Sequence, residues 1–211
     1  MTLAFIGYGN VGAPLADKLQ RAGHTVVLGA RDPESESVRA LLERNPALRV
    51  ATPERAVAAA EVVFVATPFA ANESVIPPVA RALAGKVLVD CTNPVGPGLS
   101  HGLKNAQSGS ARLQTLAPDA KVVKAFSIYG YENFEDNSFP GVSVKPAMFF
   151  CGNDADAKRC VGELIAALGW EPLDVGGLEQ ALHLEHMTLL WVRMVRLGKR
   201  SPHLVWAALQ K

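Results

Sequence analysis

Residues 3–19 read LAFIGYGNVGAPLADKL, in the order of a strand, a glycine-rich turn and a helix. The apolar run Leu3–Ile6 predicts a buried strand, and residues 13–19 are typical of an amphipathic helix. Between them lies Gly7-Tyr8-Gly9-Asn10-Val11-Gly12. In such a unit the first glycine allows a tight turn, the second lets a pyrophosphate approach the backbone, and the third lets the helix pack on the strand. The stretch therefore predicts a dinucleotide-binding turn, with the phosphates at the helix N-terminus.

The end of the next predicted strand, Thr25–Ala30, bears on which dinucleotide is bound. Sites that prefer NAD usually carry Asp or Glu there, whereas this chain has Gly29 and Ala30, followed by Arg31. A guanidinium can bind a 2′-phosphate through two charge-assisted hydrogen bonds, and a carboxylate would repel it. We therefore expect NADPH to be preferred over NADH. The alternative is that Arg31 is a solvated surface side chain.

The residues that follow the arginine also bear on the proposed phosphate contact. Ser35 and Ser37 could supply hydroxyl groups to the phosphate. Asp32 is expected to begin a turn with Pro33 rather than to face the ribose.

Size and charge bound the kinds of partner. A chain of 211 residues can bury a substantial core, and its net charge of +1 provides no electrostatic footprint for nucleic acid or an anionic membrane. No run approaches the roughly 20 apolar residues of a membrane span, and the N-terminus lacks a secretory pattern. We expect a cytoplasmic protein that acts on a small molecule.

The cysteines and histidines do not predict a metal site. Cys91, Cys151 and Cys160 are odd in number and match no zinc or redox spacing, so buried thiols are expected. His183 and His186 could share a helix face, but no third ligand has suitable spacing.

Apolar runs alternate with helical segments, a pattern typical of a parallel sheet covered on both faces. We expect an α/β, Rossmann-type, doubly wound and mainly parallel sheet over residues 1–176, with a C-terminal helical segment over residues 177–211. About eight strands are expected. After the first two they are 48–50, 62–66, 86–90, 121–126, 147–151 and 171–174. The glycine- and proline-rich stretch 92–108 has no periodicity and is a candidate substrate-side loop or lid.

Three strand ends are candidates for the ring around the nicotinamide and its ribose, because ligands bind at the carboxyl edge of such sheets. Thr67, Asn93 and Ser127 would give hydrogen bonds, while ordinary turn chemistry is the alternative. The neighbouring residues of these strand ends are Ala66, Pro68 and Pro94.

The segment Leu178–Leu197 is apolar on more than one face, so it is expected to be buried on several sides. We expect a homodimer through this helix, the alternative being that its own domain encloses it. A short helix is expected from Ser201 to Gln210. Basic side chains near the end of the long helix fit cation placement at a helix C-terminus, or else an anionic ligand site. They are Arg193, Arg196, Lys199 and Arg200.

No residue can be assigned a catalytic role from the sequence. There is no Ser-His-Asp or Cys-His arrangement and no clear pair of carboxylates. Lys124 lies in a predicted strand and is expected to form a salt bridge, although Lys124, Ser127, Tyr129 and His183 are the proton donors to consider. Hydride transfer between two flat redox cofactors would need no such donor at the receiving carbon.

Several segments together resemble one family. They are Ile6–Gly12, Gly29–Pro33, Ala66–Pro68, Asp90–Pro94, Val123–Ser127, Phe149–Asp154 and Pro172–Gly176. The chain resembles the F420-dependent NADP reductases, and its dinucleotide fold is similar to the cytosolic domain of the STEAP metalloreductases. The resemblance implies that Gly9, Asn10 and Val11 border the pyrophosphate and that Arg31 meets the 2′-phosphate.

Two positions depart from the pattern of that family. Ala30 stands where relatives commonly carry Ser or Thr, and Ala181-Leu182-His183 stands near a position where relatives often carry Ala-Arg. The second departure faces the second substrate or the partner subunit.

Three functions are thus open. The leading one is hydride transfer between NADP(H) and a flat redox cofactor, coenzyme F420 first and FMN or FAD next. The second is reduction of a small imine or carbonyl, or of a ferric chelate, since pyrroline-5-carboxylate reductases begin similarly. The third is a non-catalytic NADPH-binding redox sensor, which would bind NADPH without turnover.

Overall fold

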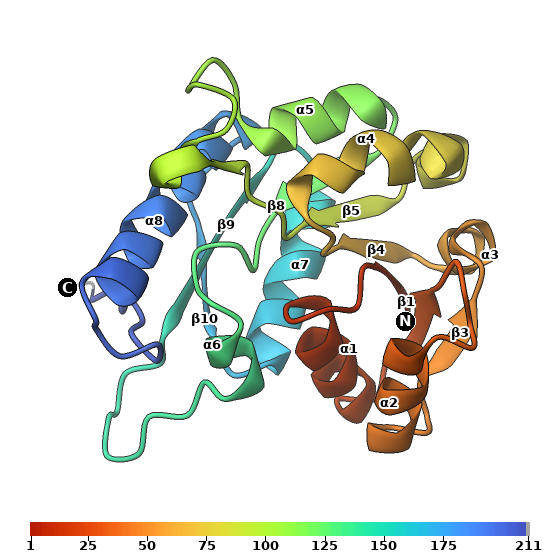
Figure 1. Ribbon diagram of the computed structural model, residues 1–211, viewed down its shortest axis with the longest axis horizontal. Coiled ribbons are helices and arrows are strands. Elements are labelled where there is room, and N and C mark those ends of the chain that lie inside the picture. Colours follow the sequence, from red (N-terminus) through yellow and green to blue (C-terminus); the bar gives the residue numbers. More distant parts are fainter. Residues whose placement is uncertain (210–211) are drawn as a thin grey trace.

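An eight-stranded sheet forms the centre of the computed structural model, which describes residues 1–209 (Figure 1). The strand order is β10-β9-β8-β5-β4-β1-β2-β3. Neighbouring strands are parallel except β8 and β9, which are antiparallel. The strands are β1 (Thr2–Ile6), β2 (Thr25–Gly29), β3 (Arg49–Ala51), β4 (Val62–Val65), β5 (Val87–Asp90), β8 (Lys121–Lys124), β9 (Ala147–Gly152) and β10 (Glu171–Asp174). The predicted doubly wound, mainly parallel sheet is confirmed.

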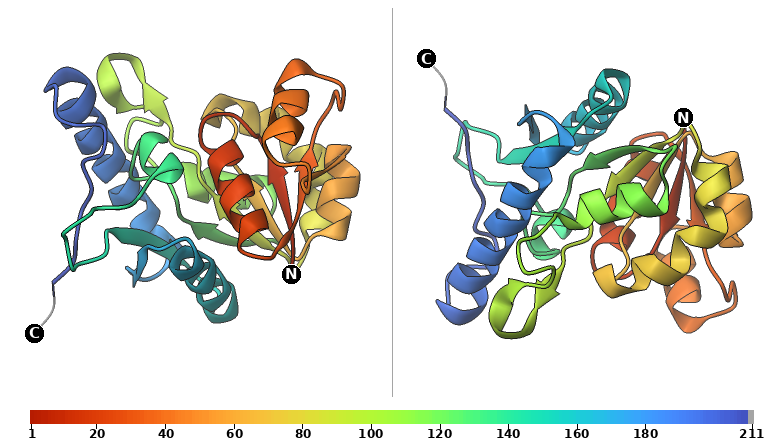
Figure 2. Two further views of the ribbon diagram at one scale, coloured as in Figure 1. Left: turned by 90° about the horizontal axis from the view of Figure 1, so that it is seen from below. Right: turned by 90° about the horizontal axis from the view of Figure 1, so that it is seen from above.

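Helices cover both faces of this sheet. Figure 2 shows α1 and α2 on one face and α4 and α5 on the other. The helix α7 packs against β9 and β10. The helices are α1 (Gly12–Arg21), α2 (Glu36–Arg44), α3 (Pro53–Ala59), α4 (Asn72–Val75), α5 (Gly109–Leu116), α6 (Glu132–Glu135), α7 (Ala155–Ala167) and α8 (Ala181–Val192). Four 3-10 turns join them: η1 (Phe69–Ala71), η2 (Pro77–Leu83), η3 (Pro97–Leu99) and η4 (Leu178–Gln180).

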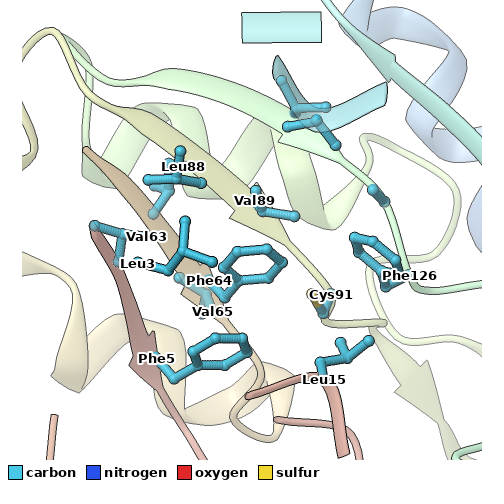
Figure 3. Close-up of a cluster of buried hydrophobic side chains, with 14 of the residues drawn as sticks. Leu3, Phe5, Leu15, Val63, Phe64, Val65, Leu88, Val89, Cys91 and Phe126 are labelled. Atoms are coloured by element: carbon cyan, nitrogen blue, oxygen red, sulfur yellow. The ribbon is translucent and has the colours of Figure 1, made fainter. Parts of the chain in front are cut away.

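The core lies along the central strands because both of their faces are covered. All four residues of β4 are buried, and Phe5 of β1 stacks on Phe64 of β4 with ring centroids 4.5 Å apart (Figure 3). Phe126 approaches Phe64 from the end of β8, with centroids 6.0 Å apart. Strands buried on both sides read as continuous apolar runs, which is why the sequence predicted them.

The position of the ligand crevice follows from the strand order. The chain proceeds from β1 to β2 and β3 on one side, and then crosses to β4, β5 and β8 on the other. Ile6 pairs with Val65 at the carboxyl ends of β1 and β4, so the turns that follow these strands are adjacent. Ligands of open parallel sheets bind at such a switch point.

The stretch 92–108 is not a featureless loop. It contains a short antiparallel hairpin of β6 (Val95–Gly96) and β7 (Ser100–His101). The hairpin lies beside α8 in Figures 1 and 2. Arg193 donates hydrogen bonds to the carbonyls of Gly98 and Leu99, at 3.2 and 3.0 Å.

The C-terminal part agrees with the expectation only up to residue 197. A helical segment covers residues 178–197 and ends in the π-helix η5 (Arg193–Leu197). The predicted helix Ser201–Gln210 is wrong over its described part, because residues 201–209 form a turn and then irregular backbone, while Gln210 lies outside the described residues. In place of intrahelical bonds, the carbonyls of Pro202, Leu204 and Trp206 accept bonds from other parts of the chain.

The helix ends agree with simple local rules. Gly23 follows α1 with a φ of +96°, a conformation that glycine adopts at little cost. Asp154 caps α7 by accepting the N–H of Ala157, at 2.8 Å.

Among residues 1–209, no helix is both long and apolar enough to cross a membrane.

Candidate dinucleotide-binding site

A cavity of about 770 Å³ lies at the switch point of the sheet. Its walls come from the turns after β1, β2, β3 and β4 and from the segment containing α4 and η2. Six of the predicted site residues line it: Gly7, Tyr8, Gly9, Arg31, Thr67 and Pro68. The carboxyl-edge rule therefore located the cavity correctly from the sequence.

The glycines of the first turn have separate structural reasons. Gly7 has a φ of +94°, and a Cβ there would lie 2.6 Å from the backbone of Ala66 and Thr67. A Cβ on Gly12 would collide with the carbonyl oxygen of Gly7, so this glycine lets α1 pack against the turn. A Cβ on Gly9 would meet nothing within 4 Å. Gly9 thus leaves open space on the side where a ligand can approach the backbone.

The first turn of α1 is open to an anion. Val11 precedes the helix and gives no side-chain cap, and no acidic residue stands in the first helical turn. The carbonyl of Gly9 accepts the N–H of Ala13 at 2.9 Å, which begins the helical pattern. Asn10 is exposed and Val11 half-buried beside this end. Free N–H groups and the helix dipole together favour a negatively charged group here.

Arg31 is the cation of the cavity wall. Its side chain is exposed, and Ser37 lines the same cavity. The hydroxyl of Ser35 lies 3.3 Å from that of Ser37. Asp32 accepts the N–H of Glu34 at 3.0 Å, which confirms its expected role in the turn.

Ala30 lies behind Arg31 and is fully buried. Its N–H donates to the carbonyl of Ala51 at 2.9 Å. Its backbone therefore fixes the strand end from which the arginine projects.

Sequence reasoning missed one wall of the cavity. Thr52, Pro53 and Glu54 follow β3, Ala71 ends η1, and Ser74, Val75, Pro78 and Val79 belong to the α4–η2 segment. The third strand was predicted, and the carboxyl-edge rule applied to its end would have identified the first of these groups. The residues of η1, α4 and η2 could be placed only once the fold had brought these elements to the cavity that the turn after β1 also lines.

A chain of hydrogen bonds leads from the cavity into the sheet. Thr67 donates to the Oδ1 of Asn72 at 3.0 Å, and the Nδ2 of Asn72 donates to Thr92 at 3.2 Å. Thr92 donates its hydroxyl to Asp90 at 2.7 Å, and its N–H to the same oxygen at 2.9 Å. Asn72, Thr92 and Asp90 are all buried. The orientation of Thr67 is thus fixed from inside the protein.

Asp90 belongs to a buried charged cluster. The Nζ of Lys124 lies 3.3 Å from Asp90 and 3.4 Å from Glu185 of α8, and it donates to the carbonyl of Thr92. Burial lowers the pKa of Lys124, but the negative charges of Asp90 and Glu185 outweigh it and raise that pKa above its ordinary value. The expected salt-bridge role of Lys124 is confirmed.

His101 joins the same cluster from the hairpin. Its Nε2 lies 2.7 Å from Glu185, while its Nδ1 accepts the N–H of Asn105 at 3.3 Å. The proton therefore resides on Nε2 and is donated to the carboxylate. Glu185 also accepts the N–H of Gly109 at the start of α5. One carboxylate thus joins α8, α5 and the hairpin.

The other two strand ends meet each other next to α8. Asn93 donates to the carbonyl of Ser127 at 2.9 Å, and the hydroxyl of Thr188 lies 2.8 Å from the same carbonyl and 3.1 Å from the Oδ1 of Asn93. Pro94 is buried, and the hydroxyl of Ser127 is buried without a hydrogen-bond partner among the described residues. None of these side chains lines the cavity.

The cysteines follow their expectation in two cases. Cys91 and Cys151 are buried free thiols, and burial raises the pKa of Cys151 to about 12. Cys160 is only partly buried.

His183 and His186 are exposed on α8. Over residues 1–209 there is no cluster of three or more potential metal-ligating side chains from His, Cys, Asp and Glu.

Comparison with known proteins gives a consistent result. A family model described as NADP oxidoreductase, coenzyme F420-dependent, matches residues 2–94. Metalloreductase STEAP3 of Rattus norvegicus is 34% identical over 188 residues, which cover 89% of this chain and 36% of that protein. F420-dependent NADP reductase of Methanothermobacter marburgensis is 29% identical over 202 residues, with 89% of each chain covered.

A solved structure shares the whole architecture. It is a protein of Arthrobacter sp. FB24, provisionally named an F420-dependent NADP reductase, with a TM-score of 0.84 and 31% identity. The match covers 94% of this chain and 95% of that one. The chain therefore spans nearly all of this relative, but only about a third of the metalloreductases it matches.

Proposed function

The chain belongs to the family of coenzyme F420-dependent NADP oxidoreductases, and on this premise we propose that it transfers hydride between NADP(H) and a flat redox cofactor. Coenzyme F420 is the first candidate for the second cofactor, and FMN or FAD the next. The observation that carries the proposal is the exposed Arg31, which lines one cavity together with Ser37 and the glycine turn. A bound NADPH would supply the hydride.

The residues of the cavity fit this dinucleotide. Gly9 leaves space for a pyrophosphate, and the open N-terminus of α1 offers N–H groups to it. Asn10 and Val11 flank that position. The guanidinium of Arg31 would bind the 2′-phosphate, with the hydroxyls of Ser35 and Ser37 beside it.

The polar groups at the carboxyl edge of the sheet favour orientation of a ligand rather than acid–base chemistry. Thr67 and Asn93 already hold internal hydrogen bonds, and Lys124 is held between two carboxylates. None of these groups is free to transfer a proton. Orientation of two rings at reacting distance is sufficient for hydride transfer, since the cofactors carry the chemistry.

A metalloreductase-like activity is the second candidate. It is favoured by the 34% identity to STEAP3 over 89% of this chain. In this alternative the electrons of NADPH would pass through a flavin to a ferric chelate. Both candidates use the same NADP(H) site and differ only in the acceptor.

We also propose that the chain forms a homodimer through residues 178–197 and works in the cytoplasm. Trp191 and Val195 of this segment are buried in their own subunit, whereas Leu190 and Leu197 are 50% and 65% exposed. The exposed leucines would be covered by a second copy of the chain.

Anaerobic NADPH oxidation by the purified protein tests the proposal. F420, FMN, FAD and a ferric chelate are supplied in parallel, with NADH as the control donor. NADPH-selective reduction of F420 supports the leading candidate, and reduction of a flavin or iron supports the second. Tight NADPH binding without turnover of any acceptor would contradict both and favour a redox sensor or a reductase of an organic substrate.

A further inference from the structure

Thr67 combines two properties that have a joint chemical consequence. It lines the cavity, and its hydroxyl is tied to the buried chain Asn72, Thr92 and Asp90. A threonine hydroxyl has a single proton to donate and two lone pairs to accept. The group that receives its proton therefore decides what the hydroxyl can offer to a ligand.

The direction of each bond in the chain follows from counting protons. One oxygen of Asp90 accepts both the N–H and the O–H of Thr92. The other oxygen accepts the hydroxyl of Ser110 at 2.6 Å and a bond from Lys124 at 3.3 Å. Asp90 therefore has four donors around it and acts only as an acceptor.

Because Thr92 gives its proton to Asp90, it can only accept from Asn72. The amide of Asn72 must then turn its NH₂ group toward Thr92 and its oxygen toward Thr67. Thr67 in turn must donate to that oxygen. The lone pairs of Thr67 are what remain for a ligand in the cavity.

We propose that this buried chain of hydrogen bonds makes the Thr67 hydroxyl an obligate hydrogen-bond acceptor. Thr67 then selects a ligand that presents an O–H or N–H donor to it. The inference rests on the proposed NADP(H) site and adds a specificity-determining residue, Thr67, with Asn72, Thr92 and Asp90 as positioning residues. A ribose hydroxyl, the carboxamide NH₂ and the adenine NH₂ share the required chemistry. A ligand with only an acceptor at this point would face two opposed sets of lone pairs.

Analogues of NADP⁺ that each lack one donor distinguish the sources. The 3-acetylpyridine analogue replaces the carboxamide NH₂ by a methyl group, deoxyribose analogues remove a hydroxyl, and the hypoxanthine analogue removes the adenine NH₂. Dissociation constants are measured calorimetrically for wild-type protein and Thr67→Val. The analogue ratio is the dissociation constant of an analogue divided by that of NADP⁺ for the same protein. We expect this ratio to be about five to ten for one analogue in the wild type, and to approach one in Thr67→Val.

Substitutions at Thr92 test the chain without touching the cavity wall. Thr92→Val removes the acceptor that orients Asn72, so the same analogue ratio should collapse, whereas Thr92→Ser keeps a hydroxyl and should preserve it. Thr67→Ser should also preserve it. Thermal melts establish whether each variant is folded. If Thr92→Val does not fold, the comparison of analogue ratios between the wild type and Thr67→Val decides the matter alone.

The outcomes separate this inference from the function on which it rests. Equal analogue ratios in wild type and Thr67→Val overturn the inference, even if NADP⁺ binds tightly. A collapse in Thr67→Val that is absent from a folded Thr92→Val overturns the role of the buried chain. A wild-type protein that binds no NADP⁺ overturns the proposed function and the inference together.

Discussion

The ammonium group of Lys124 lies 3.3 Å from the carboxylate of Asp90, and both side chains are completely inaccessible to solvent. Two adjacent strands, β8 and β5, supply the pair, and Glu185 of α8 completes it at 3.4 Å. A buried charge without its partner is costly, so this cluster ties the sheet to the C-terminal helix.

Replacement of Lys124 by Met should lower the free energy of unfolding by about 3–5 kcal/mol, because two carboxylates are left buried without their cation. Urea denaturation at pH 7 measures it. Lys121→Met is the matched control on the same strand. Lys121 pairs with Asp154 at 3.0 Å near the surface, so its loss should cost less than about 1 kcal/mol. Equal losses in the two variants would contradict the special role of the buried cluster.

The stability of the protein should also fall at alkaline pH through Lys124. Its pKa is raised in the folded state above the ordinary 10.5, so its stabilising effect is complete below pH 10.5 and is lost as the pH rises through the folded value. Unfolding free energies measured between pH 8 and 12 should show this loss in the wild type. The slope should be smaller in Lys124→Met, and identical slopes would argue against it.

Substitution of Arg31 by Ala should narrow the preference for NADPH over NADH. Loss of charge-assisted bonds to the 2′-phosphate should cost about 1.5–3 kcal/mol, or roughly ten- to hundredfold in relative affinity. Titration of NADPH and NADH by fluorescence measures the ratio. Arg39→Ala is the control, because Arg39 is exposed on α2 and does not line the cavity. Unchanged selectivity in Arg31→Ala would place the phosphate elsewhere.

Valine at position 9 should abolish dinucleotide binding while the protein stays folded. A Cβ there meets no protein atom within 4 Å, so only an approaching ligand is obstructed. Gly12→Val should instead destabilise the fold, because its Cβ would collide with Gly7. Thermal melts and NADPH titration of both variants separate the two effects. Tight NADPH binding by Gly9→Val would mean that the glycine sequence is only a turn.

A charged residue at Leu190 or Leu197 should convert the proposed homodimer into a monomer, since each side chain would be buried against the second copy. Sedimentation velocity of Leu190→Glu and Leu197→Glu measures the mass. Val142→Glu is the control, because Val142 is 59% exposed outside this segment. A wild-type protein that sediments as a monomer would refute the dimer.

Hydrophobic periodicity located the strands well, because the central strands are buried on both faces. It was less successful where the backbone does not adopt the conformation that the residue types favour. The predicted strand 121–126 ends at Lys124 in the structure, and Phe126, although apolar, has a φ of 52°, which is outside the strand conformation. The antiparallel direction of β9 depends on the long connection from residue 125 to 146, which has no periodic pattern that reveals it.

The places of the glycine turn and Arg31 on the cavity wall could be predicted, because they depend on short local sequence patterns at the ends of β1 and β2. The part of the cavity wall at Glu54 and Ser74 depends on which elements become neighbours. The chain of hydrogen bonds from Thr67 to Asp90 also depends on which elements become neighbours in the fold. Asn72 was never a candidate, because an asparagine in a short helix acquires its role only when Thr92 of the next strand end lies beside it.

The hairpin of β6 and β7 is fastened to the C-terminal helical segment at two points, through His101 to Glu185 of α8 and through the carbonyls of Gly98 and Leu99 to Arg193 of η5. Opening of this segment would have to break the buried contact between His101 and Glu185 as well as both bonds from Arg193. Residues 98–101 and α8 should therefore move as one rigid body, and the amide hydrogens of both should exchange with solvent at rates that change together when a ligand binds.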